Sequence, residues 1–211
     1  TYPSCNLILG LDEWHQTTRY CRAAEMLGFP PEAIRPVFQV PAEAEQRATE
    51  ILPDLLPPGE GPVVGLQIPH RGSRRHAVRA WPAENVVALA RALTADGCRV
   101  VLCGTGTERA EAESVKSLVP GAVVSPAVPL AVFAALQSRF DLFVAQFTGT
   151  MHLAAAVGVP VVAYGLDEQV QGWGAIGPQH RNIGAPRVSD IPVETLVEAA
   201  RAVLAGAAGR A

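Results

Sequence analysis

Hydrophobic residues form short runs that alternate with helical patterns through most of the chain. Runs rich in valine and leucine predict buried strands over residues 63–67, 98–103, 122–124, 141–145 and 161–164. Between them, apolar residues recur every three or four positions, which predicts helices over residues 82–95, 107–118, 130–138, 150–157 and 192–204. This alternation is typical of right-handed βαβ units, and strands that are apolar throughout fit a sheet covered on both faces. The pattern predicts an α/β fold: a Rossmann-like parallel sheet with helices on both faces.

Residues 1–60 lack this alternation. Helices are predicted over residues 17–27, where Gly28 follows, and over residues 42–52, between Pro41 and Pro53. Proline and glycine then concentrate in residues 57–62, which predicts a linker. We therefore expect residues 1–60 to be the tail of a preceding domain plus a linker, and residues 61–211 to be one domain. The small residues at 205–211 are expected to fray.

Composition and charge exclude several classes of protein. Hydrophobic residues make up 49% of the 211 residues and charged residues 18%, so the chain buries a core and is not disordered. No apolar stretch approaches the ~18 residues of a membrane span. A net charge of −3 without a long basic run argues against a nucleic-acid binder. The four cysteines, Cys5, Cys21, Cys98 and Cys103, show no CxxC spacing, so we expect reduced, structural thiols and a cytoplasmic protein.

Four loops lie where an open parallel sheet binds its ligands, at the carboxyl ends of strands. They are residues 68–79, with Gly72, Ser73 and several basic residues; 104–108, with Gly104 and Glu108; 146–150; and 165–181. A glycine turn alone is a weak signal, because many strand-to-helix turns need glycine. The basic residues of the first loop are equally typical of a solvated loop. The nucleotide-binding interpretation gains weight because all four loops converge on one edge of the sheet.

The third loop carries the most information. Thr148, Gly149 and Thr150 open a helix, where free backbone N–H groups and the helix dipole favour an anion. His152 lies about half a turn further in and would add a donor to the same phosphate. The alternative is an ordinary N-cap, in which a threonine caps the helix and His152 packs against the sheet.

Three segments resemble one known family. They are R-A-W-P-A-E-N at residues 79–85, V-L-C-G-T-G-T-E-R at 101–109 and T-G-T-M-H-L-A-A-A-V-G-V-P-V-V-A at 148–163. They are similar to motifs of the ADP-heptose:lipopolysaccharide heptosyltransferases, glycosyltransferase family 9. His15, Arg19, Tyr20, Leu27 and Gly28 also resemble the helix that ends the family's acceptor domain. The resemblance covers nearly the whole chain.

The resemblance implies a GT-B architecture, with two Rossmann-like domains and a nucleotide-sugar held by the C-terminal one. This chain would supply that donor-binding half plus the end of the acceptor domain, and would be inactive without the missing N-terminal domain. The implied reaction is inverting glycosyl transfer without a metal or cofactor, from ADP-heptose or a similar donor to lipopolysaccharide core or a related glycan or glycolipid. The implied location is the cytoplasm, with at most peripheral contact with the inner face of the membrane.

The implied donor-binding residues follow from the motif positions. Arg79 stands where the family has a lysine for the donor phosphates, Glu108 matches the acidic residue on the ribose hydroxyls, and Thr148, Gly149 and His152 match the diphosphate-and-sugar loop. The full expected set is Gly72, Ser73, Arg79, Gly104, Glu108, Gln146, Phe147, Thr148, Gly149 and His152.

This sequence departs from the family at Phe147, where the family has an aspartate that contacts the donor sugar. A ring cannot accept hydrogen bonds from sugar hydroxyls, though it can stack on a sugar or base. Either Phe147 faces the donor sugar, or it packs inward and leaves Gln146 to meet the ligand. The family's acceptor-activating aspartate belongs to the N-terminal domain and has no counterpart here. Two alternative functions remain open: a non-catalytic nucleotide-sugar-binding relative, and a GT-B-like sugar-nucleotide epimerase or hydrolase.

Overall fold

The computed structural model describes residues 15–29, 35–56, 59–69, 80–104, 106 and 108–208. Six parallel strands form one sheet in the order β3-β2-β1-β4-β5-β6. The strands are β1 (Val63–Gln67), β2 (Arg99–Cys103), β3 (Val123–Val124), β4 (Leu142–Gln146), β5 (Val161–Leu166) and β6 (Arg181–Ala185). The predicted α/β fold with a Rossmann-like parallel sheet is confirmed.

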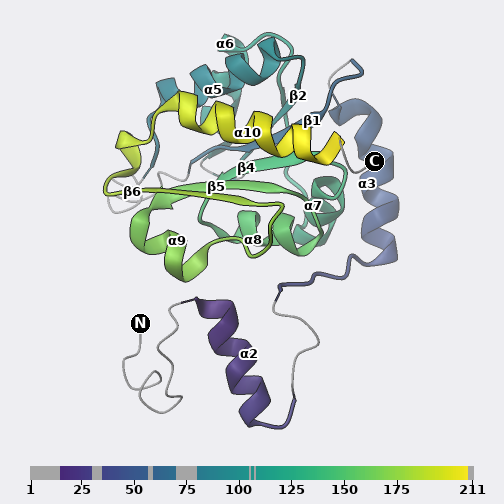
Figure 1. Ribbon diagram of the computed structural model, residues 1–211. Coiled ribbons are helices and arrows are strands. Elements are labelled where there is room, and N and C mark those ends of the chain that lie inside the picture. The colour runs from purple at the N-terminus through teal and green to yellow at the C-terminus, as the bar shows by residue number, and fades with distance from the viewer. Residues whose placement is uncertain are drawn as a thin grey trace.

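Helices cover both faces of the sheet (Figure 1). One face carries α5 (Ala83–Ala95), α6 (Glu108–Leu118) and α10 (Val193–Ala208). The other carries α3 (Ala42–Leu55), α7 (Leu130–Gln137), α8 (Gly149–Ala156) and α9 (Asp167–Trp173). A 3-10 turn, η1 (Val188–Asp190), leads into α10. None of the helices in the described ranges is long and apolar enough to cross a bilayer.

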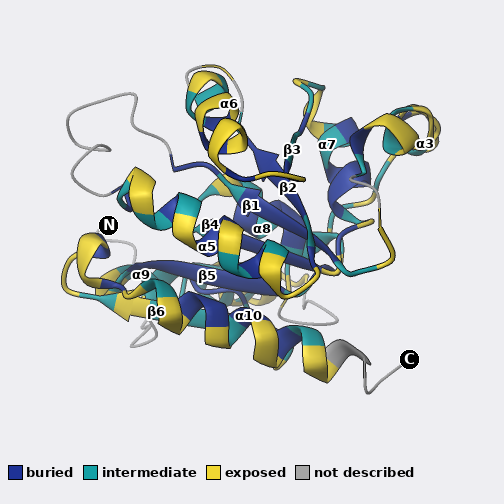
Figure 2. Ribbon diagram, turned by 90° about the horizontal axis from the view of Figure 1, so that it is seen from above, coloured by how far each residue is buried: buried dark blue, intermediate teal, exposed yellow. Residues whose placement is uncertain are grey.

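Successive residues of β1 to β5 enter opposite core clusters, so both faces of this part of the sheet are buried (Figure 2). In β1, Val64 and Leu66 pack under α5 and α10, while Val63 packs on the side of α3 and α7. Gly65 shares that second side, and a Cβ there would lie 2.6 Å from the rings of Phe140 and Phe143. This two-sided burial explains why the strands are apolar throughout rather than alternating.

Helix α2 (Gln16–Met26) lies apart from both layers, beyond α8 and α9 (Figure 1), and has no buried residue. Its N-cap is His15, whose Nδ1 accepts a hydrogen bond from the Thr17 N–H at 3.3 Å. The same imidazole donates from Nε2 to the carbonyl of Gly174 at 2.8 Å. One histidine therefore caps α2 and ties it to the end of α9.

Two predicted helix ends were wrong. The second helix was expected to end before Pro53, yet α3 continues to Leu55 with Pro53 in its last turn. Leu55 is buried in the second core cluster, and its burial outweighs the one hydrogen bond that proline cannot donate. At the other end of the chain, α10 reaches Ala208, so residues 205–208 are helical rather than frayed.

Residues 165–181 were predicted to be a loop, but they contain α9, and β6 begins at their end. α9 has no buried residue, and the side chains of β6 are exposed or half-buried. Neither segment therefore shows the apolar periodicity by which the other elements were found.

Helix α3 packs against α7, although the sequence pattern grouped it with residues 1–60. Ala44, Ala48 and Leu55 belong to the second core cluster, and Glu45 pairs with Arg139 at 2.7 Å. Packing thus joins α3 to the sheet. The division of the chain into residues 1–60 and 61–211 stays a prediction.

Two of the described cysteines, Cys98 and Cys103, are buried, as expected of structural thiols, whereas Cys21 is half-buried. Cys21, Cys98 and Cys103 are free, and Cys5 lies outside the described residues. Burial raises the pKa of both the Cys98 and the Cys103 thiol, which keeps them protonated.

Candidate functional site

The strand order creates a crevice between β1 and β4. From β1 the chain turns to α5 on one face, and from β4 it turns to α8 on the other, although the two strands are neighbours with Leu66 opposite Val144. In open α/β sheets, ligands bind at such a reversal of strand order, outside the carboxyl ends of the strands.

A cavity of about 570 Å³ opens at this edge. Its lining comes from the ends of β1 and β2, the starts of α6 and α8, the segment after β3, and α7. The lining residues are Gln67, Ile68, Cys103, Gly104, Glu108, Ser125, Val128, Leu130, Phe133, Thr148, Gly149 and Thr150. Side chains of Ile68, Val128, Leu130 and Phe133 give an apolar wall, whereas Glu108 and the threonines of α8 supply polar groups.

The N-terminus of α8 has no side-chain cap. Thr148 occupies the N-cap position, yet its hydroxyl oxygen accepts no hydrogen bond from the first turn of the helix, and its proton goes to Gln67 Oε1 at 3.1 Å. The hydroxyls of Thr148 and Thr150 are 3.0 Å apart. The alternative of an ordinary threonine cap is therefore wrong, and the first-turn N–H groups of α8 keep their capacity to bind an anion.

The two site glycines differ in what surrounds them. A Cβ on Gly149 would meet no atom within 4 Å, so the protein's own packing does not require glycine there. A Cβ on Gly104 would lie 2.9 Å from Glu108 Cβ and 3.3 Å from Ile68 Cβ. Gly104 therefore lets α6 start close to the end of β2, which brings Glu108 to the cavity.

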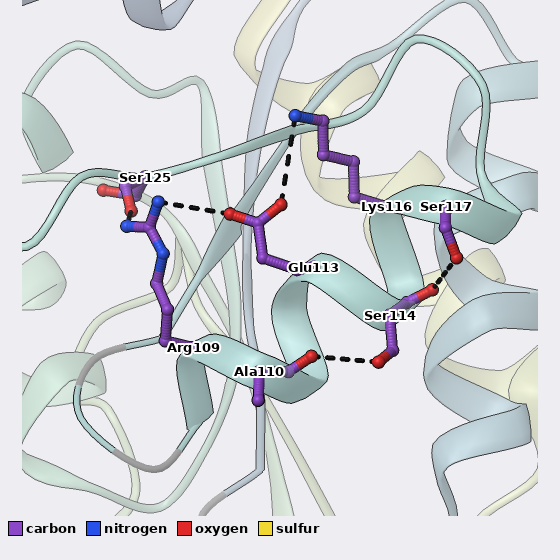
Figure 3. A network of polar contacts seen from close by, with 7 residues as sticks. All are labelled: Arg109, Ala110, Glu113, Ser114, Lys116, Ser117 and Ser125. Carbon is purple, nitrogen blue, oxygen red and sulfur yellow. Dashed lines mark hydrogen bonds and ion pairs between the residues drawn. The ribbon is translucent and has the colours of Figure 1, made fainter.

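A polar network fixes the start of α6 (Figure 3). Arg109 donates to the carbonyl of Ser125 at 3.2 Å and pairs with Glu113 at 3.1 Å, and Lys116 approaches the same carboxylate at 4.0 Å. Ser125 is buried and lines the cavity. Arg109 thereby links the start of α6 to the segment after β3. Glu108, the residue before Arg109, is held at the cavity by this link.

Phe147 and His152 lie on the other side of α8 and do not line the cavity. A Cβ on Gly165 would lie 2.6 Å from the Phe147 ring, so the ring packs on β5 and against the second core cluster. This position favours the inward-packed alternative for Phe147. The His152 ring meets Trp173 edge-on at 6.2 Å. Burial, with the nearby His15, lowers the pKa of His152, so its imidazole is neutral near pH 7.

The cavity thus brings together four of the residues expected from the sequence: Gly104, Glu108, Thr148 and Gly149. Gln146, Phe147 and His152 stand outside its lining, and Gly72, Ser73 and Arg79 lie outside the described residues. Gln67, Ser125 and the apolar wall also line the cavity, although the sequence patterns did not predict them as site residues. Gln67 had a usable signal, because it is a polar residue at the carboxyl end of an apolar strand. Within the described ranges, no three His, Cys, Asp or Glu side chains cluster as metal ligands do.

Solved structures of longer proteins share this fold. A glycosyl transferase family 9 protein from Veillonella parvula superposes with a TM-score of 0.79 at 19% identity, over 93% of this chain and 61% of that one. ADP-heptose lps heptosyltransferase II of E. coli superposes with a TM-score of 0.68 at 20% identity, over 85% of this chain and 56% of that one. E. coli heptosyltransferase WaaC, solved with ADP, superposes with a TM-score of 0.64 at 20% identity, over 88% of this chain and 55% of that one. The chain thus spans a little over half the length of these relatives.

No curated protein sequence matches the chain. The model of one family, glycosyltransferase family 9 (heptosyltransferase), matches residues 12–195. That span holds the whole described sheet, the cavity and the start of α8. The chain belongs to glycosyltransferase family 9.

Proposed function

We propose that this chain supplies the nucleotide-sugar-binding half of a glycosyltransferase, with the cavity at the β1/β4 crevice as the nucleotide site. One observation carries the proposal: an apolar wall, a carboxylate and an uncapped helix N-terminus line the same cavity. These are the three chemistries that a base, a ribose and a diphosphate require.

Each part of the cavity suits one part of the donor. The apolar wall of Val128, Leu130 and Phe133 offers a surface for a planar base. Glu108 offers carboxylate oxygens that accept hydrogen bonds from ribose hydroxyls. The first turn of α8 offers N–H groups and the positive end of a helix dipole to the diphosphate.

The proposed reaction is inverting glycosyl transfer without a metal. An acceptor hydroxyl attacks the anomeric carbon, the bond from that carbon to the diphosphate oxygen breaks, and the nucleoside diphosphate leaves. Donors aimed at the leaving diphosphate stabilise the charge that develops on it, and holding both substrates in place lowers the barrier further. The base that deprotonates the acceptor would come from the remainder of a full-length protein.

ADP-heptose is the donor we propose, with lipopolysaccharide core or a related glycan as acceptor. Support for the donor comes from the relatives: WaaC was solved with ADP and with ADP-2-deoxy-2-fluoro heptose. The free thiols Cys21, Cys98 and Cys103 fit the reducing cytoplasm, where we place the protein.

A nucleotide-sugar binder without catalytic activity is the second candidate. The packing of Phe147 on Gly165 favours it, because the family's sugar-contacting carboxylate is replaced by a ring that turns away from the cavity.

Titration of the 211-residue chain with ADP-heptose, ADP, GDP and UDP, followed by backbone amide shifts, tests the proposed site. We expect saturable shifts at Gly104, Glu108 and residues 148–150. Shifts confined to residues 1–60, or no binding by any of the four, would refute it. Sugar transfer by this chain joined to the N-terminal part of a family member, with none by the chain alone, would separate the enzyme from the non-catalytic binder.

A further inference from the structure

Gln67 ends β1 at the crevice and lies outside the three sequence segments that resemble the family. Its neighbours fix its backbone: Gln67 pairs with Cys103 of β2, and the Ile68 N–H donates to the Cys103 carbonyl at 2.8 Å. Its half-buried side chain lines the cavity, opposite the start of α8. Gln67 is therefore held on the rigid sheet rather than on a loop.

The Gln67 carboxamide presents its oxygen to the threonine hydroxyls at the start of α8. Thr148 donates its single hydroxyl proton to Gln67 Oε1 at 3.1 Å. The proton in the 3.0 Å contact between Thr148 and Thr150 must then come from Thr150. The chain of donors runs from Thr150 through Thr148 to Gln67 and ends on the amide oxygen. Both protons of Gln67 Nε2 remain, and among the described residues the structure gives this nitrogen no hydrogen-bond partner.

We propose that Gln67 is a diphosphate-binding residue, which donates from Nε2 to a phosphate oxygen of the nucleotide held at the start of α8. This inference rests on the proposed function. The carboxamide of Gln67 and the first turn of α8 meet from opposite sides of the crevice, so an anion between them receives donors from both β1 and α8. Thr148 acts through Gln67 as a positioning residue, because its hydroxyl holds the amide oxygen and leaves Nε2 for the ligand.

Gln67→Glu gives the sharpest test. Glutamate keeps the shape and the acceptor for Thr148, but it offers the cavity a negative charge in place of two donors. We expect ADP to bind at least about 10-fold more weakly, since hydrogen bonds to charged groups are among the strongest. Adenosine, which has no phosphate, should bind as it does to the parent. The loss for ADP should shrink as the pH falls toward the ordinary pKa of glutamate, about 4.3.

Gln46→Glu is the matched control, because it makes the same chemical change at an exposed position of α3, outside the cavity lining. It should leave both affinities unchanged. The assignment of Gln67 would be overturned if the Gln67→Glu variant bound ADP as tightly as the parent. It would also be overturned if the variant lost affinity for adenosine and ADP equally. A parent that binds neither ligand would instead overturn the proposed function. The thermal midpoint of each variant shows whether a loss of ADP affinity comes from misfolding. If Gln67→Glu misfolds, the comparison of ADP with adenosine is repeated with Gln67→Met, which removes the two donors without adding a charge.

Discussion

On the cavity side of the α8 N-terminus, Thr148, Gly149 and Thr150 border open space, whereas on the α9 side Phe147 and His152 lie against other parts of the protein. The five positions fall within six consecutive residues. The comparison shows that neighbours in one motif serve different purposes. Substitutions on the packed side should mainly change stability, and substitutions on the cavity side should mainly change binding.

The largest effect is expected on the packed side, from Phe147→Asp. The new carboxylate would lie half-buried against Gly165 and the second core cluster, without a described positive partner. We expect the free energy of unfolding to fall by about 3 kcal/mol, with no gain in ADP-heptose affinity. Urea denaturation and titration measure the two quantities, with Phe147→Leu as the apolar control. A stable variant that binds ADP-heptose more tightly would show instead that this side chain faces the donor sugar.

Gly104→Ala should disturb both stability and binding. The new Cβ would lie 2.9 Å from Glu108 Cβ, so the start of α6 must shift. We expect a loss of about 2 kcal/mol in unfolding free energy, together with weaker ADP binding because Glu108 moves. Chemical denaturation and calorimetric titration test this. Unchanged stability would mean that α6 adapts freely and that Gly104 does not set its position.

Gly149→Ala sharpens the comparison from the cavity side. Its Cβ meets no protein atom within 4 Å, and alanine favours a helix, so stability should hold or rise by up to about 1 kcal/mol. ADP affinity should nevertheless fall about 10-fold, because the methyl group occupies the path of the phosphate. Gly206→Ala in α10, also surrounded by open space, is the control and should leave affinity unchanged. Equal ADP affinity in both variants would place the diphosphate elsewhere.

The smallest effect is a pH dependence that comes from His152, on the packed side, and from His180, which precedes β6. Burial lowers the pKa of His152 and of His180, so the unfolded chain takes up these protons more readily than the folded one. Their contribution to stability is complete above the unfolded pKa of about 6.5 and declines as the pH falls below it. We expect the unfolding free energy to drop by less than about 1 kcal/mol per histidine between pH 7.5 and 5.5. His152→Gln should remove part of that drop, and an unchanged drop would assign the effect to other groups.

The sequence predicted most of the strands and their covering helices because the buried apolar residues of these elements recur at regular spacing. β6 and α9 have no such apolar spacing, since the side chains of β6 are exposed or half-buried and α9 has no buried residue. Thr148 and Gly149 could be expected at the site from helix N-terminal chemistry alone. The side on which Phe147 and His152 lie could not, because it depends on Gly165 and Trp173. Gln67 escaped notice because hydropathy patterns do not specify which strands are neighbours.

The pairing of β1 with β4 has a consequence for folding. Val63 donates its N–H to the Asp141 carboxylate at 2.7 Å across a separation of 78 residues, a longer chain closure than any other strand pairing in the sheet requires. Closing long loops costs the most entropy, so this seam is expected to form late. Gln67 and Thr148 come from opposite sides of the seam. A nucleotide bound there would bridge two folding halves, and its binding would report on refolding that has reached completion.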